Sequence, residues 1–209
     1  MTDEISNLDI EYVVHTMLDD YAPCPLTLID CSISIQNAAE EDITIGRAYI
    51  QSLDVEYCAQ QGALPDLMQK REYGHYAYTS AIFDFTGDVK KNIRNQLKRP
   101  IKTRNYLAID RIEIIPEYRS LGLSEVLISE VTRLFSAKTN ILAIRADPLQ
   151  FRKEEVAEAS NEWVQDLRLD ELSTDRQTAS TSLKNYFSRQ GFADTNRNHI
   201  MVRHIDGEH

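Results

Sequence analysis

The sequence has few cysteines, which limits the covalent and metal-bound frameworks it can build. Its 209 residues include only Cys24, Cys31 and Cys58, with no Cys-x-x-Cys pair. An odd number of cysteines cannot close a full disulfide framework, and structural zinc sites draw on cysteines or histidines at short spacing. The histidines near the C-terminus lack such a partner set as well. We therefore expect reduced, mostly buried cysteines and no metal.

Long apolar runs are also missing. No stretch approaches the roughly 18 residues that cross a bilayer. The first residues, MTDEISNLDIEYV, are acidic, where a secretory signal is basic and then apolar. These features predict a cytoplasmic protein without membrane contact. Its length and its 42% hydrophobic content predict one domain, residues 1–209, around one core.

Positive charge is in the minority, with 23 Lys and Arg against 33 Asp and Glu, a formal net charge of −10. This balance disfavours nucleic acid and favours a cationic partner such as an amine. Acidic residues are absent between Val89 and Ile109, where basic residues gather instead: Lys90, Lys91, Arg94, Lys98, Arg99, Lys102 and Arg104. This basic cluster is either a solvated connection or a local site for phosphate groups.

Hydrophobic periodicity in the first half predicts a helix followed by two strands. Residues 6–20 place apolar side chains at helical spacing, which predicts an amphipathic helix. Residues 26–35 and 43–58 are rich in β-branched side chains and flank the polar turn QNAAEED, so we expect antiparallel strands there. The aromatic residues 64–85 favour a helix, although Gly74 weakens that prediction.

The second half predicts a βαβ unit. Residues 104–115 read as a strong strand, residues 123–134 as a helix, and residues 140–146 as a short buried strand, an order typical of a right-handed crossover. The charged residues 147–176 read as an insertion with an inward-facing helix around Val156, Trp163, Val164 and Leu167. A last helix, with Tyr186 and Phe187 at helical spacing, should end at Gly191 before the strand HIMVRHI.

The junction inside the βαβ unit reads IEIIPEYRSLGLSEVLI, from Ile112 to Ile128. A strand that turns through Arg119 and Gly122 into a helix leaves several backbone N–H groups without an internal partner, and these groups favour an anion. The alternative is a plain strand-to-helix turn that uses glycine only for its positive φ.

The order of elements and two motifs resemble the GNAT superfamily of acyl-CoA-dependent N-acyltransferases. The first motif is IIPEYRSLGLS, with Ser124 where Gly or Ala is usual, and the second is NYFSRQGF. The resemblance covers residues 106–202 and implies an α/β fold, a GNAT-like mixed and splayed central sheet flanked by helices. It implies one domain made of four parts: residues 1–105 (helix, strands and helical cover), 106–146 (acyl-CoA binding), 147–176 (helical insertion) and 177–209 (last helix and strand).

The resemblance also implies a coenzyme site for acetyl-CoA. Backbone of Ile112, Glu113 and Ile114 would pair with the pantetheine arm as another strand would. The pyrophosphate would lie on the turn made of Arg119, Ser120, Leu121, Gly122, Leu123, Ser124 and Glu125. A residue of the basic cluster would meet the ribose phosphate.

Acyl transfer needs a neutral amine and a proton for the leaving thiolate. Asp110 is the first candidate for the base, and its alternative is a structural carboxylate that is hydrogen-bonded at a strand edge or paired with Arg111. Glu113 has the opposite strand parity and should face the other side unless a bulge intervenes. The family's tyrosine acid falls on Phe187, so Tyr186 is either a shifted acid or a core residue, and we expect catalysis without a tyrosine acid.

The segment around His75, Tyr76 and Tyr78 either covers the acceptor site or packs in the core, as does the Trp163 helix. The leading function is transfer of an acetyl or short acyl group to a primary amine, on a small molecule or on a peptide or protein. The alternatives are an acyl-CoA-binding sensor without turnover and a toxin that acetylates aminoacyl-tRNA, which the acidic charge disfavours. A homodimer is one option for assembly.

Overall fold

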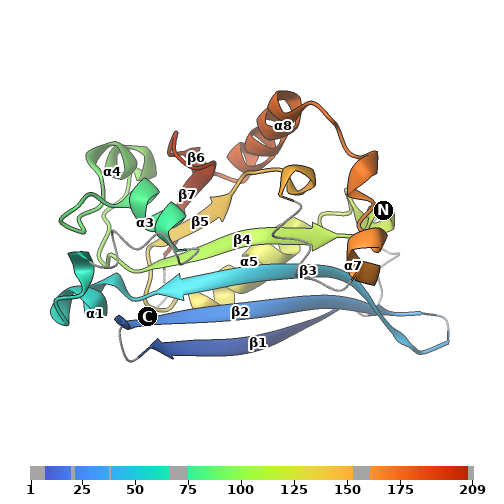
Figure 1. The fold of residues 1–209 in the computed structure, drawn as a ribbon, viewed down its shortest axis with the longest axis horizontal. Coiled ribbons are helices and arrows are strands. Elements are labelled where there is room, and N and C mark those ends of the chain that lie inside the picture. Colours follow the sequence, from blue (N-terminus) through green and yellow to red (C-terminus); the bar gives the residue numbers. More distant parts are fainter. Residues whose placement is uncertain (1–7, 20–21, 38, 66–74, 153–160, 207–209) are drawn as a thin grey trace.

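A computed structural model describes residues 8–19, 22–37, 39–65, 75–152 and 161–206 (Figure 1). One seven-stranded sheet crosses the molecule in the order β1-β2-β3-β4-β5-β7-β6. The neighbours β4 and β5 are parallel, and every other neighbouring pair is antiparallel. The strands are β1 (Leu8–Asp19), β2 (Ala22–Gln36), β3 (Asp42–Leu53), β4 (Tyr106–Ile114), β5 (Ile141–Arg145), β6 (Ala193–Asp194) and β7 (Ile200–His204). The chain is a mixed α/β fold, as the sequence predicted.

The helix predicted over residues 6–20 is wrong, because Leu8–Asp19 forms the edge strand β1. It pairs with β2 from Leu8↔Ile35 to Asp19↔Ala22. Leu8, Ile10 and Tyr12 alternate along β1 and pack against the core, whereas Val13 and Val14 are 47% and 53% exposed. An edge strand covered on one face needs only this alternation. The expected order of helix, strand, strand is therefore absent from the first half.

The two predicted strands that follow are confirmed as β2 and β3, but the second ends earlier than expected. Residues 55–60, which we assigned to a strand, form helix α1 (Val55–Gln60). Asp54 begins this helix, because its carboxylate accepts a hydrogen bond from the N–H of Tyr57 at 2.9 Å. Of the helix expected over residues 64–85, the structure describes α3 (Tyr76–Ile82), and residues 66–74 lie outside the described ranges.

Helices cover both faces of the sheet and bury one core on each side. Besides α1 and α3 they are α4 (Lys91–Leu97), α5 (Leu123–Phe135), α7 (Asn161–Asp166) and α8 (Arg176–Arg189). Side chains of α5 and α8 pack with Leu107 and Ile109 of β4. Side chains of α1, α3 and α4 pack with Tyr106 and Ala108, which face the opposite side. We did not predict α4, because the basic cluster hides its buried Ile93 and Leu97.

The predicted βαβ unit is confirmed as β4, α5 and β5. The core-facing residues expected in the helix, Leu123, Leu127 and Val131, are buried, but Leu134 is 42% exposed. The last helix and strand are confirmed as α8 and β7. Gly191 follows α8 with φ +85°, the left-handed conformation that ends many helices.

The predicted insertion contains α7 and a small core of its own. Trp163, Leu167 and Leu169 are buried together, and Ile115, just after β4, packs against them. Val164 is only partly buried, and Val156 lies outside the described residues. Two of the four expected inward-facing side chains therefore anchor this segment to the end of β4.

One cysteine prediction needs correction, because Cys58 is disulfide-bonded, whereas Cys31 is free and buried as expected. No helix within the described ranges is both long and apolar enough to span a bilayer. Among those same residues, no three or more histidine, cysteine, aspartate or glutamate side chains gather as metal ligands.

Candidate functional site

The parallel pairing of β4 with β5 ends just before Asp110. Their parallel pairing runs from Tyr106↔Ile141 to Ile109↔Ile144 and stops there, while β4 continues beside β3 to Ile114. A β-bulge lies at the same point, because Tyr49 pairs with Arg111 and Ile50 pairs with Ile109, which leaves Asp110 as an extra residue on β4. The first-choice catalytic residue therefore lies where the sheet opens.

The bulge changes which side chains share a face. Beyond it, Ile112 and Ile114 pack on the α5 and α8 side, so Arg111 and Glu113 point to the opposite face. Asp110 also turns to that face, where it meets Tyr78 of α3. The bulge that we named as the exception to the parity argument is present, so Glu113 and Asp110 share a face.

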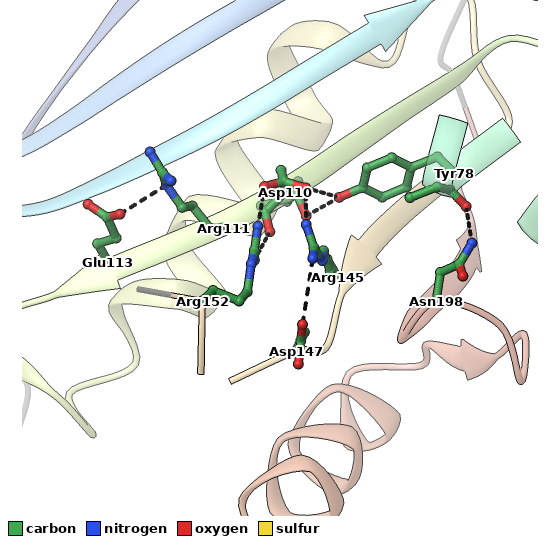
Figure 2. Close-up of polar contacts among 10 residues, drawn as sticks. Tyr78, Asp110, Arg111, Glu113, Arg145, Asp147, Arg152 and Asn198 are labelled. Atoms are coloured by element: carbon green, nitrogen blue, oxygen red, sulfur yellow. Dashed lines mark hydrogen bonds and ion pairs between the residues drawn. The ribbon is translucent and has the colours of Figure 1, made fainter. Parts of the chain in front are cut away.

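Asp110 is held by three side chains (Figure 2). The hydroxyl of Tyr78 donates to Oδ1 at 2.8 Å, and Nη2 of Arg152 donates to Oδ2 at 2.6 Å. Nη1 of Arg152 also donates to the backbone carbonyl of Asp110 at 3.0 Å. Arg145 of β5 lies 3.6 Å from Oδ1 and 3.6 Å from Asp147. The partners of Asp110 are thus Arg145 and Arg152, rather than the Arg111 that we had considered.

These partners determine the charge states in the cluster. Burial alone would raise the pKa of Asp110, but Arg152, Tyr78 and Arg145 outweigh it and lower that pKa below its ordinary value. Burial, followed by the charge of Asp110, raises the pKa of Tyr78 well above its ordinary value. Asp110 is therefore an ionised hydrogen-bond acceptor and Tyr78 a protonated donor. A carboxylate with a lowered pKa has little tendency to take a proton from an amine.

A second polar cluster lies on the same face of the sheet, further along β4. The Glu113 side chain is fully buried, 2.9 Å from Nε of Arg111, and accepts a hydrogen bond from the indole of Trp163 at 2.6 Å. Arg47 of β3 stacks 4.3 Å above the Trp163 ring, and Arg111 stacks 3.7 Å above Tyr49. Buried charge of this kind needs such partners, so the Glu113 side chain has a structural role.

The turn before α5 has the geometry of an anion cradle. Ser120 and Gly122 have φ of +65° and +80°, and Gly122 begins α5 without a side-chain cap. Within the described chain, the N–H groups of residues 120–124 have no hydrogen-bond acceptor. A Cβ built on Gly122 would meet no atom within 4 Å, so the space above the turn is open. Backbone donors at a helix N-terminus that face open space suit a phosphate.

Two members of the predicted cradle have other roles. The N–H of Glu125 donates to the carbonyl of Gly122 at 2.9 Å, so Glu125 does not belong to the set of free donors. The Arg119 guanidinium donates to the carbonyl of Ile114 at 2.9 Å and to the carbonyl of Leu167. Arg119 therefore ties the turn to β4 and to the insertion through its side chain.

The unusual Ser124 has a partner on α8. Its Oγ lies 2.5 Å from the hydroxyl of Tyr186, at the first turn of α5. Phe187, which the GNAT resemblance alone would align with a tyrosine acid, is buried and packs edge-on against Phe192. The Tyr186 hydroxyl, next in sequence to the expected acid position, therefore lies against the turn before α5. The hydroxyl that lies in the Asp110 cluster is that of Tyr78.

The basic cluster lies at the opposite end of β4 from the turn that is predicted to bind the coenzyme pyrophosphate. It precedes the N-terminal end of this nine-residue strand, whereas the turn follows its C-terminal end. A strand of that length spans about 30 Å. The ribose phosphate of a coenzyme is linked within a few bonds to the pyrophosphate, so these residues are not placed to contact it.

Sequence reasoning missed Arg145 and Arg152, and it left Tyr78 without a definite role. Arg145 carries a signal in retrospect, because the parallel register places it opposite Asp110, one step past Ile109↔Ile144. Arg152 stands 42 positions from Asp110 and follows no pattern that could reveal the contact.

Comparison of the chain with protein-family models, with curated proteins and with solved structures gives no match.

Proposed function

We propose that this chain transfers an acetyl or short acyl group from acyl-CoA to a primary amine, and that its sheet is a splayed, GNAT-like one. The observation that carries the proposal is the parting of β4 from β5 at Asp110, followed by a turn with open, unpartnered N–H groups. A parallel strand pair that opens towards a helix N-terminus suits an extended chain that ends in phosphates.

In this proposal the pyrophosphate binds the N–H groups of residues 120–124, and the pantetheine lies along the free edge of β4. The backbone carbonyls at the two ends of that edge already accept hydrogen bonds from guanidinium groups. Arg152 donates to the carbonyl of Asp110, and Arg119 donates to the carbonyl of Ile114. Ile112, between them, is the residue best placed to pair its backbone with a pantetheine amide. The acyl group then lies near Asp110.

The chemistry would rest mainly on positioning the acyl donor and the amine together. A thiol has a pKa of about 8.5, so the thiolate leaves readily at neutral pH and water can return its proton. Asp110 remains the predicted residue nearest the amine, although its lowered pKa favours orienting Tyr78 or the amine over accepting the proton. Tyr78 is then the protonated hydroxyl closest to the reacting atoms.

A specific observation favours a second candidate, an acyl-CoA-binding module without turnover. Asp110 is engaged by Tyr78, Arg145 and Arg152, and Phe187 has no hydroxyl to offer. A site that lacks both an available base and a tyrosine acid can hold an acyl-CoA without transferring the acyl group.

The test is turnover of acetyl-CoA, followed as release of free thiol, against a panel of small amines and peptides. Intact mass would identify an acylated protein acceptor or self-acylation. Amine-dependent thiol release that is lost in Gly122→Val supports the enzyme. Calorimetric binding of acetyl-CoA without thiol release supports the module, and absence of binding contradicts both.

A further inference from the structure

Two adjoining hollows flank the basic segment between α4 and β4. One has a volume of about 510 Å³ and the other about 470 Å³, and they share Glu56, Lys102 and Thr103. Volumes of this size are ordinary for small-molecule sites. The proposed acyl transfer uses neither hollow, since both lie at the N-terminal end of β4.

The segment between the hollows is held in place by contacts with α1 and with the residues just before β5. Glu56 of α1 accepts the N–H of Arg104 at 3.2 Å, and Asn140 accepts the N–H of Lys102 at 2.9 Å. Asn105 accepts the N–H of Glu56 at 3.1 Å and, through its carbonyl, the Thr139 hydroxyl at 2.6 Å. The segment is therefore preorganised, which argues against a loose, solvated connection.

Three cationic side chains at the hollows have no ion-pair partner among the described residues, whereas Arg99 of the same segment pairs with Asp206. Within the described residues, Lys102, Arg104 and Lys138 form no ion pair. The carboxylates that line the hollows are those of Asp54, Glu56 and Asp88. Asp54 and Glu56 accept backbone N–H groups, and Asp88 lies 4.0 Å from Arg94. Three cations without an ion-pair partner, two of them on a segment whose backbone is held in place, favour an anion at these hollows in a chain with a net charge of −10.

An aromatic ring borders the same hollow as Lys102 and Lys138. Tyr57 of α1 is 43% exposed and lines the larger hollow together with Gln60. An exposed ring beside cations can stack with a nucleobase while the cations hold phosphates. We propose that this basic groove binds a nucleoside polyphosphate, with its phosphates on Lys102, Arg104 and Lys138 and its base on Tyr57.

Calorimetry with ATP at about 0.15 M salt tests the phosphate contacts. The double variant Lys102→Gln with Arg104→Gln should bind ATP at least about tenfold more weakly than the native chain. The matched control, Arg133→Gln with Arg189→Gln, removes the same charge elsewhere and should leave the affinity unchanged. Circular dichroism checks that both variants fold. Equal losses in the two double variants, or no ATP binding to the native chain, would overturn the proposal.

Inorganic tripolyphosphate tests the base contact. ATP should bind more tightly than tripolyphosphate to the native chain, and Tyr57→Ala should remove that difference without weakening tripolyphosphate binding. Equal affinities in the native chain would overturn the assignment to a nucleotide. The groove is separate from the acyl-CoA turn, so Gly122→Val should bind ATP normally, and a loss of ATP binding in that folded variant would contradict a second site.

Discussion

Arg152 donates two hydrogen bonds to Asp110, one from Nη1 to its backbone carbonyl at 3.0 Å and one from Nη2 to its carboxylate at 2.6 Å. The Arg152 side chain is 2% exposed, and the Asp110 side chain is 24% exposed. The contact therefore joins the start of the insertion to the bulge on β4, with the guanidinium buried and the carboxylate partly exposed. A charge pair of this kind is costly to break from one side.

Asp110→Asn should destabilise the fold by roughly 3 kcal/mol at neutral pH, because it leaves a buried guanidinium without its counter-charge. Urea denaturation measures this loss. The pKa of Asp110 is lowered in the folded state, so its contribution is fully present above about pH 4 and is lost as the pH falls through the folded pKa. The stability difference between native chain and variant should therefore narrow in acid, and a difference independent of pH would contradict the ion pair.

The kinetics of Asp110→Asn also show whether Asp110 acts as a general base or only as a positioning residue. Loss of a general base should lower turnover by roughly a hundredfold near neutral pH, and the loss should shrink at high pH, where more amine is already neutral. Because the carboxylate is engaged, we expect a smaller loss that is similar at each pH in a variant shown to be folded. A rate–pH profile that loses one ionisation would restore Asp110 as the base.

Gly122→Val should sharply weaken acetyl-CoA binding, because its side chain would fill the open space over the anion turn. Gly62 offers a matched control, with φ of +71° and no atom within 4 Å of a built Cβ. Both substitutions force a β-branched residue to a positive φ, which costs about 1–3 kcal/mol, so their effects on stability should be similar. If calorimetry finds equal coenzyme affinity in the two variants, the turn is not the phosphate site.

Tyr186→Phe should lower turnover less than about tenfold, because its hydroxyl contacts Ser124 and lies outside the Asp110 cluster. Ser124→Ala removes the other half of the same contact and should match it in kinetics and melting temperature. Phe187→Tyr buries a hydroxyl and should cost about 1–3 kcal/mol without restoring an acid. A loss of several hundredfold in Tyr186→Phe, with coenzyme affinity intact, would make Tyr186 the acid.

Trp163→Phe should destabilise the chain by about 2 kcal/mol, because the buried carboxylate of Glu113 loses the indole donor. Trp163 is the one tryptophan in the sequence, so native fluorescence reports the docking of α7 directly. Glu113→Gln removes the charge and keeps the acceptor, so its emission should stay close to that of the native chain. A red-shifted, water-exposed emission in the native chain would contradict the buried contact.

Much of the second half of the fold could be predicted from the sequence, because its helices and strands carry distinct periods and have Pro116, Gly122 or Gly191 at their boundaries. The edge strand β1 could not be predicted in this way. Val13 and Val14 are apolar although they are exposed, and together with their neighbours they produce the apolar spacing of a helix in a segment that forms a strand. Helix α4 was also difficult to predict, because its only buried side chains, Ile93 and Leu97, stand among lysine and arginine residues.

The strand-to-helix turn at Gly122 could be predicted, because Pro116 and Gly122 mark it locally in the sequence, and anion binding there stays a prediction. The surroundings of Asp110 could not be predicted, because they depend on the bulge and on contacts from three distant segments. Tyr78, Arg145 and Arg152 come from a helix, a neighbouring strand and the insertion. No local pattern specifies how such segments meet.

Asp110 is an extra residue that the pairing of β3 with β4 does not need. If it were removed, Arg111 would follow Ile109 directly and still lie opposite Tyr49, so the ladder would become regular and residues 111–114 would keep their present faces. A deletion would instead remove the carboxylate that Tyr78 and Arg152 share. Shortening the chain by this one residue should therefore cost at least as much stability as Asp110→Asn, because both changes leave the Arg152 guanidinium without its counter-charge.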